Sequence, residues 1–182
     1  MDKEEQERLN GALWNRCSNY ILGELFESPR INATQLGQII DQYTARGADI
    51  NAQNAHKETL LIRFTKRGLD DAVEVLLSKK NVNVHLKDQT NKTAFAHACE
   101  LFAKEEKKPP FARKIQLRRV LLLLALYGTD IDEVNEEGIK YIDIIHDKVT
   151  RRNIQTGARQ FKLNPEHPFP ILLINQRKKS FD

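Results

Sequence analysis

The stretch Gly47-Ala48-Asp49-Ile50-Asn51 opens the unit of sequence that decides the fold. This polar turn is followed by Thr59-Leu60-Leu61, which begins an apolar segment ending at Gly68, and by a second apolar segment from Ala72 to Leu77. Each segment is long enough for one short helix. Because two short helices cannot bury their apolar faces alone, the unit predicts a stack of similar neighbours.

The unit recurs further along the chain. Asn81-Val82-Asn83-Val84-His85 follows the first turn after 34 residues, and Thr93 follows Thr59 at the same spacing. Gly128-Thr129-Asp130-Ile131-Asp132 comes another 47 residues later. This longer spacing equals one period of about 33 residues plus an insertion of roughly 14. Three turns in register with their apolar segments indicate a helical repeat protein.

These turns resemble the finger motif of ankyrin-repeat proteins, and the resemblance extends over about residues 34–146. It implies an all-α fold, an α-solenoid of four or five ankyrin-like helix pairs with short turn fingers. The family's Thr-Pro-Leu-His motif has no proline and no histidine in this chain. Without the proline, a residue that favours a helix start is missing. Without the histidine, a link between repeats that the resemblance implies is missing. We therefore expect irregular stacking. The family's Thr-Pro-Leu-His motif is replaced by Thr59-Leu60-Leu61-Ile62, Thr93-Ala94-Phe95-Ala96 and Lys140-Tyr141-Ile142-Asp143.

We expect residues 1–182 to form a single ankyrin-repeat domain, because this length suffices to bury a substantial core. The turns divide the domain into an N-terminal capping helix pair, one regular repeat, one repeat with an insertion at about 103–115, and a C-terminal repeat with its cap. The corresponding ranges are 1–46, 47–80, 81–127 and 128–182.

The composition is that of a soluble globular protein, with 40% hydrophobic and 30% charged residues. No apolar run reaches the length of a membrane-spanning helix, and the charged start from Met1 to Glu5 does not resemble a secretory signal. Cys17 and Cys99 belong to different predicted helices, so we expect two buried, reduced thiols. These features predict a cytoplasmic location in the source cell. For a bacterial effector that is delivered into a host, they predict the cytoplasm of the host cell.

Residues 9–27 are predicted to form the first long helix, because apolar residues recur at every fourth position from Leu9. Trp14 widens this apolar stripe and is expected to pack in the core. Asn32, followed three residues later by Gln35, predicts a capping box at the start of the second helix. The two helices would form the N-terminal cap of the array.

The insertion is rich in charge and contains Pro109-Pro110 followed by Phe111. Because prolines cannot continue a helix, we expect an exposed loop or a bent extension of the preceding helix, and we favour the solvated loop. Insertions in repeat arrays often lie on a functional surface, and Phe111 among charged residues keeps that alternative open.

The C-terminal repeat is less regular in sequence. Residues 141–152 are predicted to form its first helix, with Ile145 and Val149 on one face. Residues 153–166 are polar and are expected to be irregular. Residues 171–174 are expected to belong to a closing helix that has a proline at its start.

Neither nucleic-acid binding nor catalysis is indicated. The formal net charge is +4, but the basic residues are scattered among acids, and no helix-turn-helix, zinc-ligand or aromatic RNA-binding pattern occurs. His97 and Cys99 are two positions apart, so they point to different faces of a helix. No histidine has the spacing of a metal-ligand set. We expect no enzyme activity, no cofactor and no metal.

Leu122 and Leu126 align with repeat positions that face outward on the convex side, and their spacing places them on one helix face. Two adjacent exposed leucines need a cover. The candidates are the insertion around Phe111, the tail from Phe169 to Ile174, and a second copy of the protein. We favour cover within the chain, and hence a monomer, with a homodimer through these leucines as the alternative.

We predict that the protein binds another protein through its turn tips and its concave face, where ligands of the resembled family bind. The face is expected to grade from basic to acidic along the stack. In one class of function, the protein is a free-standing adaptor or inhibitor, and this class includes bacterial effectors that act on host proteins. The alternative is a regulatory fragment of an enzyme or complex whose activity lies in another chain. The candidate binding residues are Gln53, His56, Glu58, Lys66, Arg67, Gln89, Lys92, Leu101, Phe111, Glu136, Glu137, Ile139 and Lys148.

Overall fold

The computed structural model describes residues 2–22, 32–106 and 111–163, and every regular element in these ranges is helical. No helix among them is long and apolar enough to cross a membrane. In chain order the elements are α1 (Lys3–Leu22), α2 (Ala33–Ala45), α3 (Leu60–Arg67), α4 (Asp70–Leu77), α5 (Ala94–Glu105), α6 (Phe111–Leu126), the single 3-10 turn η1 (Tyr141–Ile144) and α7 (Lys148–Leu163).

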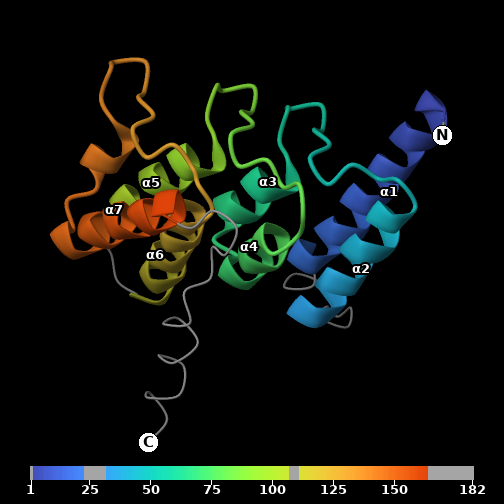
Figure 1. Ribbon diagram of the computed structural model, residues 1–182, viewed down its shortest axis with the longest axis horizontal. Helices are drawn as coiled ribbons and strands as arrows, with labels where there is room; N and C mark the ends of the chain where they lie inside the picture. Colours follow the sequence, from blue (N-terminus) through green and yellow to red (C-terminus); the bar gives the residue numbers. More distant parts are fainter. Residues whose placement is uncertain (1, 23–31, 107–110, 164–182) are drawn as a thin grey trace, which may run out of the picture.

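The helices stack in two rows, and three turn fingers project from one side of the stack (Figure 1). The first row is α1, α3, α5 and η1, and the second row is α2, α4 and α6, with α7 packed on α6. We refer to residues 47–58, 81–92 and 128–140 as the first, second and third finger. Over the described residues the fold is therefore an all-α solenoid of four ankyrin-like helix pairs, of which η1 with α7 is the fourth.

The helix boundaries follow local signals in the sequence. The hydroxyl oxygens of Thr59 and Thr93 accept hydrogen bonds from the backbone N–H three residues further on, both at 3.2 Å, and so begin α3 and α5. Gly68 ends α3 in the left-handed conformation, with φ of 72°. The capping box of Asn32 and Gln35 is present at the start of α2. These caps confirm the predicted starts of the three helices.

The core lies between the two rows. Phe64 of α3 and the α5 residues Phe95 and Phe102 are fully buried, together with Leu76 of α4 and Leu121 of α6. Each such side chain contributes roughly 1.5–3 kcal/mol by leaving water. The core therefore holds each helix pair to the next, as a repeat array requires.

α1 begins at Lys3, which is earlier than the expected start at residue 9. Leu9, Leu13 and Cys17 of its apolar stripe are buried in the core, as predicted. The end of the predicted helix, at residues 23–27, lies outside the described residues. Trp14 lies at the edge of the core and is half-buried. Its Nε1 donates to the carbonyl oxygen of Ala52 at 3.2 Å, and the guanidinium of Arg63 lies over its ring, 5.5 Å from the centroid.

The insertion lengthens two helices, which corrects the solvated-loop prediction for its described residues. α5 has 12 residues and α6 has 16, whereas α3 and α4 have 8 each. Residues 103–105 belong to α5, and residues 111–115 belong to α6. Residues 107–110 and the side chain of Phe111 lie outside the described part of the chain. A proline just before a helix suits the helix start, which is consistent with α6 beginning at this point.

The first helix of the last repeat was predicted wrongly. Only a 3-10 turn forms at Tyr141–Ile144, and a new helix starts at Lys148. Asp147 caps the start of this new helix, because its Oδ1 accepts from the backbone N–H groups of Val149 and Thr150 at 3.1 and 3.3 Å. An aspartate in this position caps a helix N-terminus.

α7 then runs to Leu163, through residues that were expected to be irregular. Val149 is 63% exposed whereas Ile145 is buried, so these two residues do not share a buried face. The helical spacing of the inner face is regular, but small and polar residues make it weakly apolar, which is why the sequence did not reveal it. Residues 171–174 lie outside the described residues. The buried positions of α7 are Thr150, Ile154, Gly157 and Ala158.

α7 covers one of the two leucines that were expected to be exposed. Leu126 is only 3% exposed, and Leu122 is half-buried. A Cβ placed on Gly157 of α7 would lie 3.5 Å from Leu126 Cγ and 3.5 Å from Ala125 Cβ, so the two helices touch here. Cover within the chain is therefore found at Leu126, where α7 provides it. The tail from Phe169 to Ile174 and the side chain of Phe111 lie outside the described residues.

We expect Leu126→Ala to lower the free energy of unfolding by about 2–5 kcal/mol, because it opens a cavity between α6 and α7. Ile115→Ala in the same helix is the control, since Ile115 is 63% exposed and should cost less than about 0.5 kcal/mol. Urea denaturation measures both variants. Equal, small losses would show that α7 does not cover Leu126.

Gly128 and Gly138 provide a second test of the same packing. Both have positive φ, 83° and 77°, but only a Cβ at Gly128 would overlap the ring of Phe161 of α7. Gly138→Ala should cost about 1–2 kcal/mol for the backbone alone, and Gly128→Ala should cost about 1–3 kcal/mol more. Thermal denaturation compares them. If adding Phe161→Leu recovers none of the Gly128→Ala loss, the overlap with Phe161 is refuted.

Candidate interaction surface

The three fingers share one turn geometry. Asn54, Asp88 and Asn135 are equivalent residues, at spacings of 34 and 47. The Oδ1 of each accepts hydrogen bonds from the backbone N–H groups two and four residues further on, at 2.8–3.4 Å. The turn also needs positive φ three residues after this side chain, and Lys57, Asn91 and Gly138 adopt it. Each fingertip is thus fixed by its own side chain.

The first and second fingers are joined by the amide of Asn51. Its Nδ2 donates to the carbonyl oxygen of Asn81 at 2.8 Å, and its Oδ1 accepts from the backbone N–H of Asn83 at 2.8 Å. This single side chain therefore satisfies one acceptor and one donor of the neighbouring finger.

α1 makes the equivalent pair of bonds to the first finger. Gln6 donates from Nε2 to the carbonyl oxygen of Gly47, and Asn10 Oδ1 accepts from the backbone N–H of Asp49 at 2.7 Å. Gly47 and Asp49 are the equivalents of the residues that Asn51 contacts, displaced by 34 positions. α1 therefore makes the two hydrogen bonds to the first finger that a preceding finger would make.

The tips of the first two fingers are also joined. The backbone N–H of Gln89 donates to the carbonyl oxygen of His56 at 3.0 Å, and the His56 Nδ1 lies 3.3 Å from Gln89 Oε1. Gln53 Nε2 donates to the carbonyl oxygen of Lys87 at 2.9 Å. Three candidate binding residues, Gln53, His56 and Gln89, thus hold one fingertip against the next.

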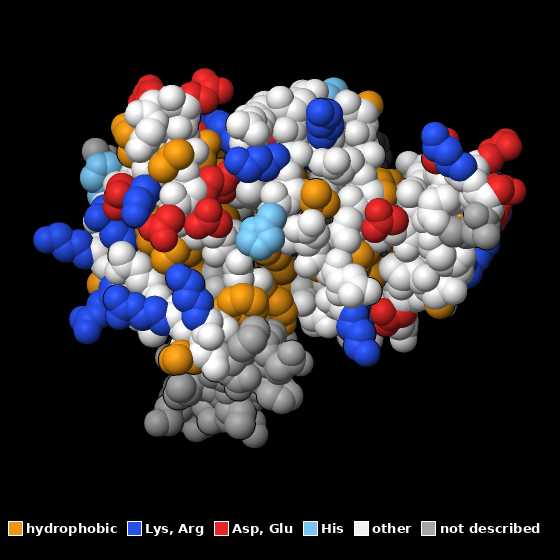
Figure 2. Space-filling model, turned by 45° about the horizontal axis from the view of Figure 1, so that its top comes forward, with side chains coloured by type: hydrophobic (Ala, Val, Ile, Leu, Met, Phe, Trp, Pro, Cys, Tyr) orange, Lys and Arg blue, Asp and Glu red, His pale blue; other side chains and the backbone are white. Residues whose placement is uncertain are grey.

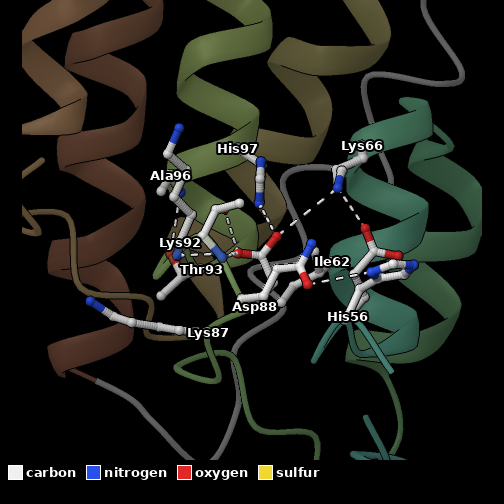
Figure 3. Close-up of polar contacts among 12 residues, drawn as sticks. His56, Ile62, Lys66, Lys87, Asp88, Lys92, Thr93, Ala96 and His97 are labelled. Atoms are coloured by element: carbon white, nitrogen blue, oxygen red, sulfur yellow. Dashed lines mark hydrogen bonds and ion pairs between the residues drawn. The ribbon is translucent and has the colours of Figure 1, made fainter. Parts of the chain in front are cut away.

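A cluster of charged groups lies beneath the second finger (Figure 3). The buried Asp88 carboxylate has Oδ2 at 2.8 Å from His97 Nε2 and at 4.0 Å from Lys66 Nζ. Burial opposes ionisation of Asp88, but hydrogen bonds from Thr90 and His97 outweigh it and hold the pKa below its usual value. Asp88 therefore remains charged and ties the finger to α5.

Glu58 and Glu133 are two further buried carboxylates. Glu58 lies 2.5 Å from Lys66 Nζ, and Glu133 lies 3.1 Å from Lys87 Nζ and 2.6 Å from Thr93 Oγ1. Burial alone would raise the pKa of Glu58, yet Lys66 lowers it below the usual value. Each buried acid thus has a basic partner, as buried charges require.

The concave face is formed by the outer sides of α3 and α5. On α3 the side chains of Arg63, Lys66 and Arg67 are the ones not fully buried. On α5, His97, Leu101 and Lys104 share one helix face. Among the described residues, Arg67 and Lys104 take part in no ion pair or hydrogen bond. The face therefore carries accessible positive charge between the fingers and the helix ends.

Acidic side chains gather on the third finger, at the upper left of Figure 2. Glu136 and Glu137 at its tip are exposed. A shallow groove of about 400 Å³ separates this tip from the second finger, with Glu100 and Tyr141 in its lining. Lys92 Nζ lies 2.6 Å from Glu100 Oε1 within the groove. The exposed Arg67 and Lys104 thus lie on α3 and α5, and the exposed Glu136 and Glu137 lie at the tip of the third finger.

The candidate binding residues occupy different environments. Glu58 was predicted to bind a partner, but its carboxylate is buried and paired with Lys66. Lys148 starts α7, rather than lying within a first-row helix. The Phe111 side chain lies outside the described residues. Lys66, Lys92 and Leu101 are half-buried, and the exposed candidates are Gln53, His56, Arg67, Gln89, Glu136, Glu137, Ile139 and Lys148.

Sequence reasoning missed the polar residues beneath the fingers, above all Asp88, His97 and Glu133. The recurrence of Asn or Asp at 54, 88 and 135 was a usable signal, because it has the same spacing as the turns. No such signal marks Glu133. Within the described ranges no three His, Cys, Asp or Glu residues are grouped as a metal site would require.

No protein-family model matches this sequence, and no curated protein does. Among solved structures, the chain is similar to an ankyrin repeat domain from Acinetobacter baumannii AYE, with 13% identity, a TM-score of 0.37, and 84% of this chain and 96% of that one covered. It is also similar to a chain in the complex of a predatory endopeptidase from Bdellovibrio bacteriovorus with an immunity protein, with 18% identity, a TM-score of 0.33, and 71% and 92% covered. At these levels neither structure carries an argument, and the fold rests on the helix pairs and fingers described above.

Asp88 makes the stability of the protein depend on pH. A carboxyl with a lowered pKa stabilises the fold above its usual pKa of 3.8, and this contribution is lost as the pH falls through the lower folded value. Asp88→Asn keeps the turn acceptor and removes the charge, so at pH 6 it should cost about 1–3 kcal/mol. Urea denaturation should show a smaller difference from wild type at pH 3. An undiminished difference at pH 3 would contradict the ionised Asp88.

Proposed function

We propose that this protein binds another protein through the concave face of α3 and α5 and through the adjoining fingertips. The observation that carries the proposal is that Arg67 and Lys104 are exposed on the outer sides of these two helices, while every other face of α3 is buried. Fingers fixed by side-chain hydrogen bonds present their tips without a large ordering cost, and a preorganised surface of this kind favours binding.

The charges on this surface support a partner of mixed charge. Arg67 and Lys104 suit an acidic segment lying along the two helices, whereas Glu136 and Glu137 suit a basic one at the third finger. Such complementary patterns favour one orientation of the partner and raise the association rate. We therefore propose electrostatic steering of a partner that carries an acidic and a basic region.

The two cysteines support binding over nucleophilic catalysis. Both thiols are buried, and burial raises the pKa of Cys17 to about 12 and that of Cys99 well above its usual value. Because the thiolate is the reactive form, neither sulfur is a nucleophile at neutral pH. We extend the proposal to a non-catalytic, monomeric adaptor or inhibitor. A bacterial effector role and a regulatory role within a larger complex are finer alternatives that the captured partner would separate.

Affinity capture with the full chain, followed by mass spectrometry, would identify partners. Arg67→Glu combined with Lys104→Glu should then weaken binding of a captured partner by about tenfold or more, because both exposed cations would change sign. Lys66 and Lys92 are left unchanged, since reversing them would place like charges beside Glu58 and Glu100. Isothermal titration calorimetry measures the dissociation constant.

The matched control is Arg152→Glu with Arg159→Glu, which reverses the same charge on exposed positions of α7. It should leave the affinity unchanged, and both double variants should keep the wild-type melting temperature to within a few degrees. If the two double variants bind equally well, the interface lies elsewhere and the concave-face proposal fails.

A further inference from the structure

The two junctions between fingers should be alike in a regular array, but they differ. At the first junction the backbone N–H of Gln89 donates to the carbonyl oxygen of His56 at 3.0 Å. Glu136 lies 47 residues after Gln89, and Thr90 lies 34 residues after His56. The equivalent groups at the second junction are therefore the N–H of Glu136 and the carbonyl of Thr90. Among the described residues these two groups form no such bond. The second junction is therefore open at its tips.

The sequence explains this difference. The amides of Asn51 and Gln53 bridge the first junction, and their equivalents in the second finger are His85 and Lys87. A lysine has three donors and no acceptor, and Lys87 pairs with the buried Glu133 at the base of the third finger. Among the described residues, the second and third fingers are thus joined by the ion pair of Lys87 with the buried Glu133, and no hydrogen bond joins their tips.

The space between these tips is the groove of about 400 Å³ described above. Its walls combine side-chain charge with two backbone groups that no described residue pairs with. The second finger contributes Thr90 and Lys92, and the third contributes Glu136 and Glu137. Lys92 is neutralised by Glu100 at 2.6 Å. Two carboxylates on the third finger therefore remain without a basic partner among the described residues.

We propose that this groove binds an extended segment of a partner polypeptide that carries lysine or arginine. The carbonyl of Thr90 and the N–H of Glu136 would pair with the backbone of the segment, as an adjacent finger does at the first junction. Glu136 and Glu137 would hold its cationic side chain by charge-assisted hydrogen bonds. The inference rests on the proposed function and names the chemistry of the partner at this end of the surface.

The test is an NMR titration of the ¹⁵N-labelled full chain with the hexapeptide acetyl-Gly-Ser-Lys-Arg-Ser-Gly-amide. We expect saturable shifts at the backbone amides of Thr90, Asn91, Glu136 and Glu137, with little change at His56 and Gln89. The control peptide, which has Glu-Glu in place of Lys-Arg, should produce none of these shifts. Glu136→Gln with Glu137→Gln should weaken the titration about tenfold, which is a change of about 1.4 kcal/mol.

The matched control variant is Glu4→Gln with Glu7→Gln, on α1, which removes the same charge and should titrate like the wild type. The proposal is overturned if the basic peptide causes no shifts, if the acidic peptide causes the same ones, or if the Glu136 and Glu137 variant titrates unchanged. Arg67 and Lys104 do not line the groove. A failure here therefore leaves the charge-reversal test of the concave face as an independent result.

Discussion

The turn at each fingertip is the interaction on which the rest of the surface depends. In it a single Asn or Asp side chain accepts two backbone hydrogen bonds, at Asn54, Asp88 and Asn135. A finger has no core of its own, so without this side chain its polar backbone would have only water as a partner. The first and second fingers lead directly into Thr59 and Thr93, the caps at which α3 and α5 begin.

A row of buried carboxylates connects these turns to the helices. Glu58, Asp88 and Glu133 are each held by a basic group from a neighbouring element. Removing one partner would leave a buried charge uncompensated, which is costly. This polar row ties each finger to a first-row helix or to the finger beside it. The first junction is closed at the tips, whereas the second is open.

The fold could be predicted where local chemistry decides it. Thr59 as a helix cap and Gly68 as a helix stop act within their own turn, and their spacing along the chain revealed the stack. α7 was not predicted: its buried positions recur at helical spacing, but Gly157 and Ala158 among them are small and add little apolar signal. The sequence named the elements of the surface but not the environment of each side chain. Glu58, for example, is buried because it pairs with Lys66 of the following helix, and this pairing depends on how the chain folds.

Hydrogen exchange at two equivalent backbone amides tests the central claim, that the first finger junction is closed and the second is open. Two-dimensional NMR in deuterated solvent follows the N–H of Gln89 and that of Glu136. The account predicts that Gln89, bonded to His56, exchanges at least about tenfold more slowly than its unprotected rate, while Glu136 exchanges near that rate. Comparable protection of Glu136, or none at Gln89, would contradict the account.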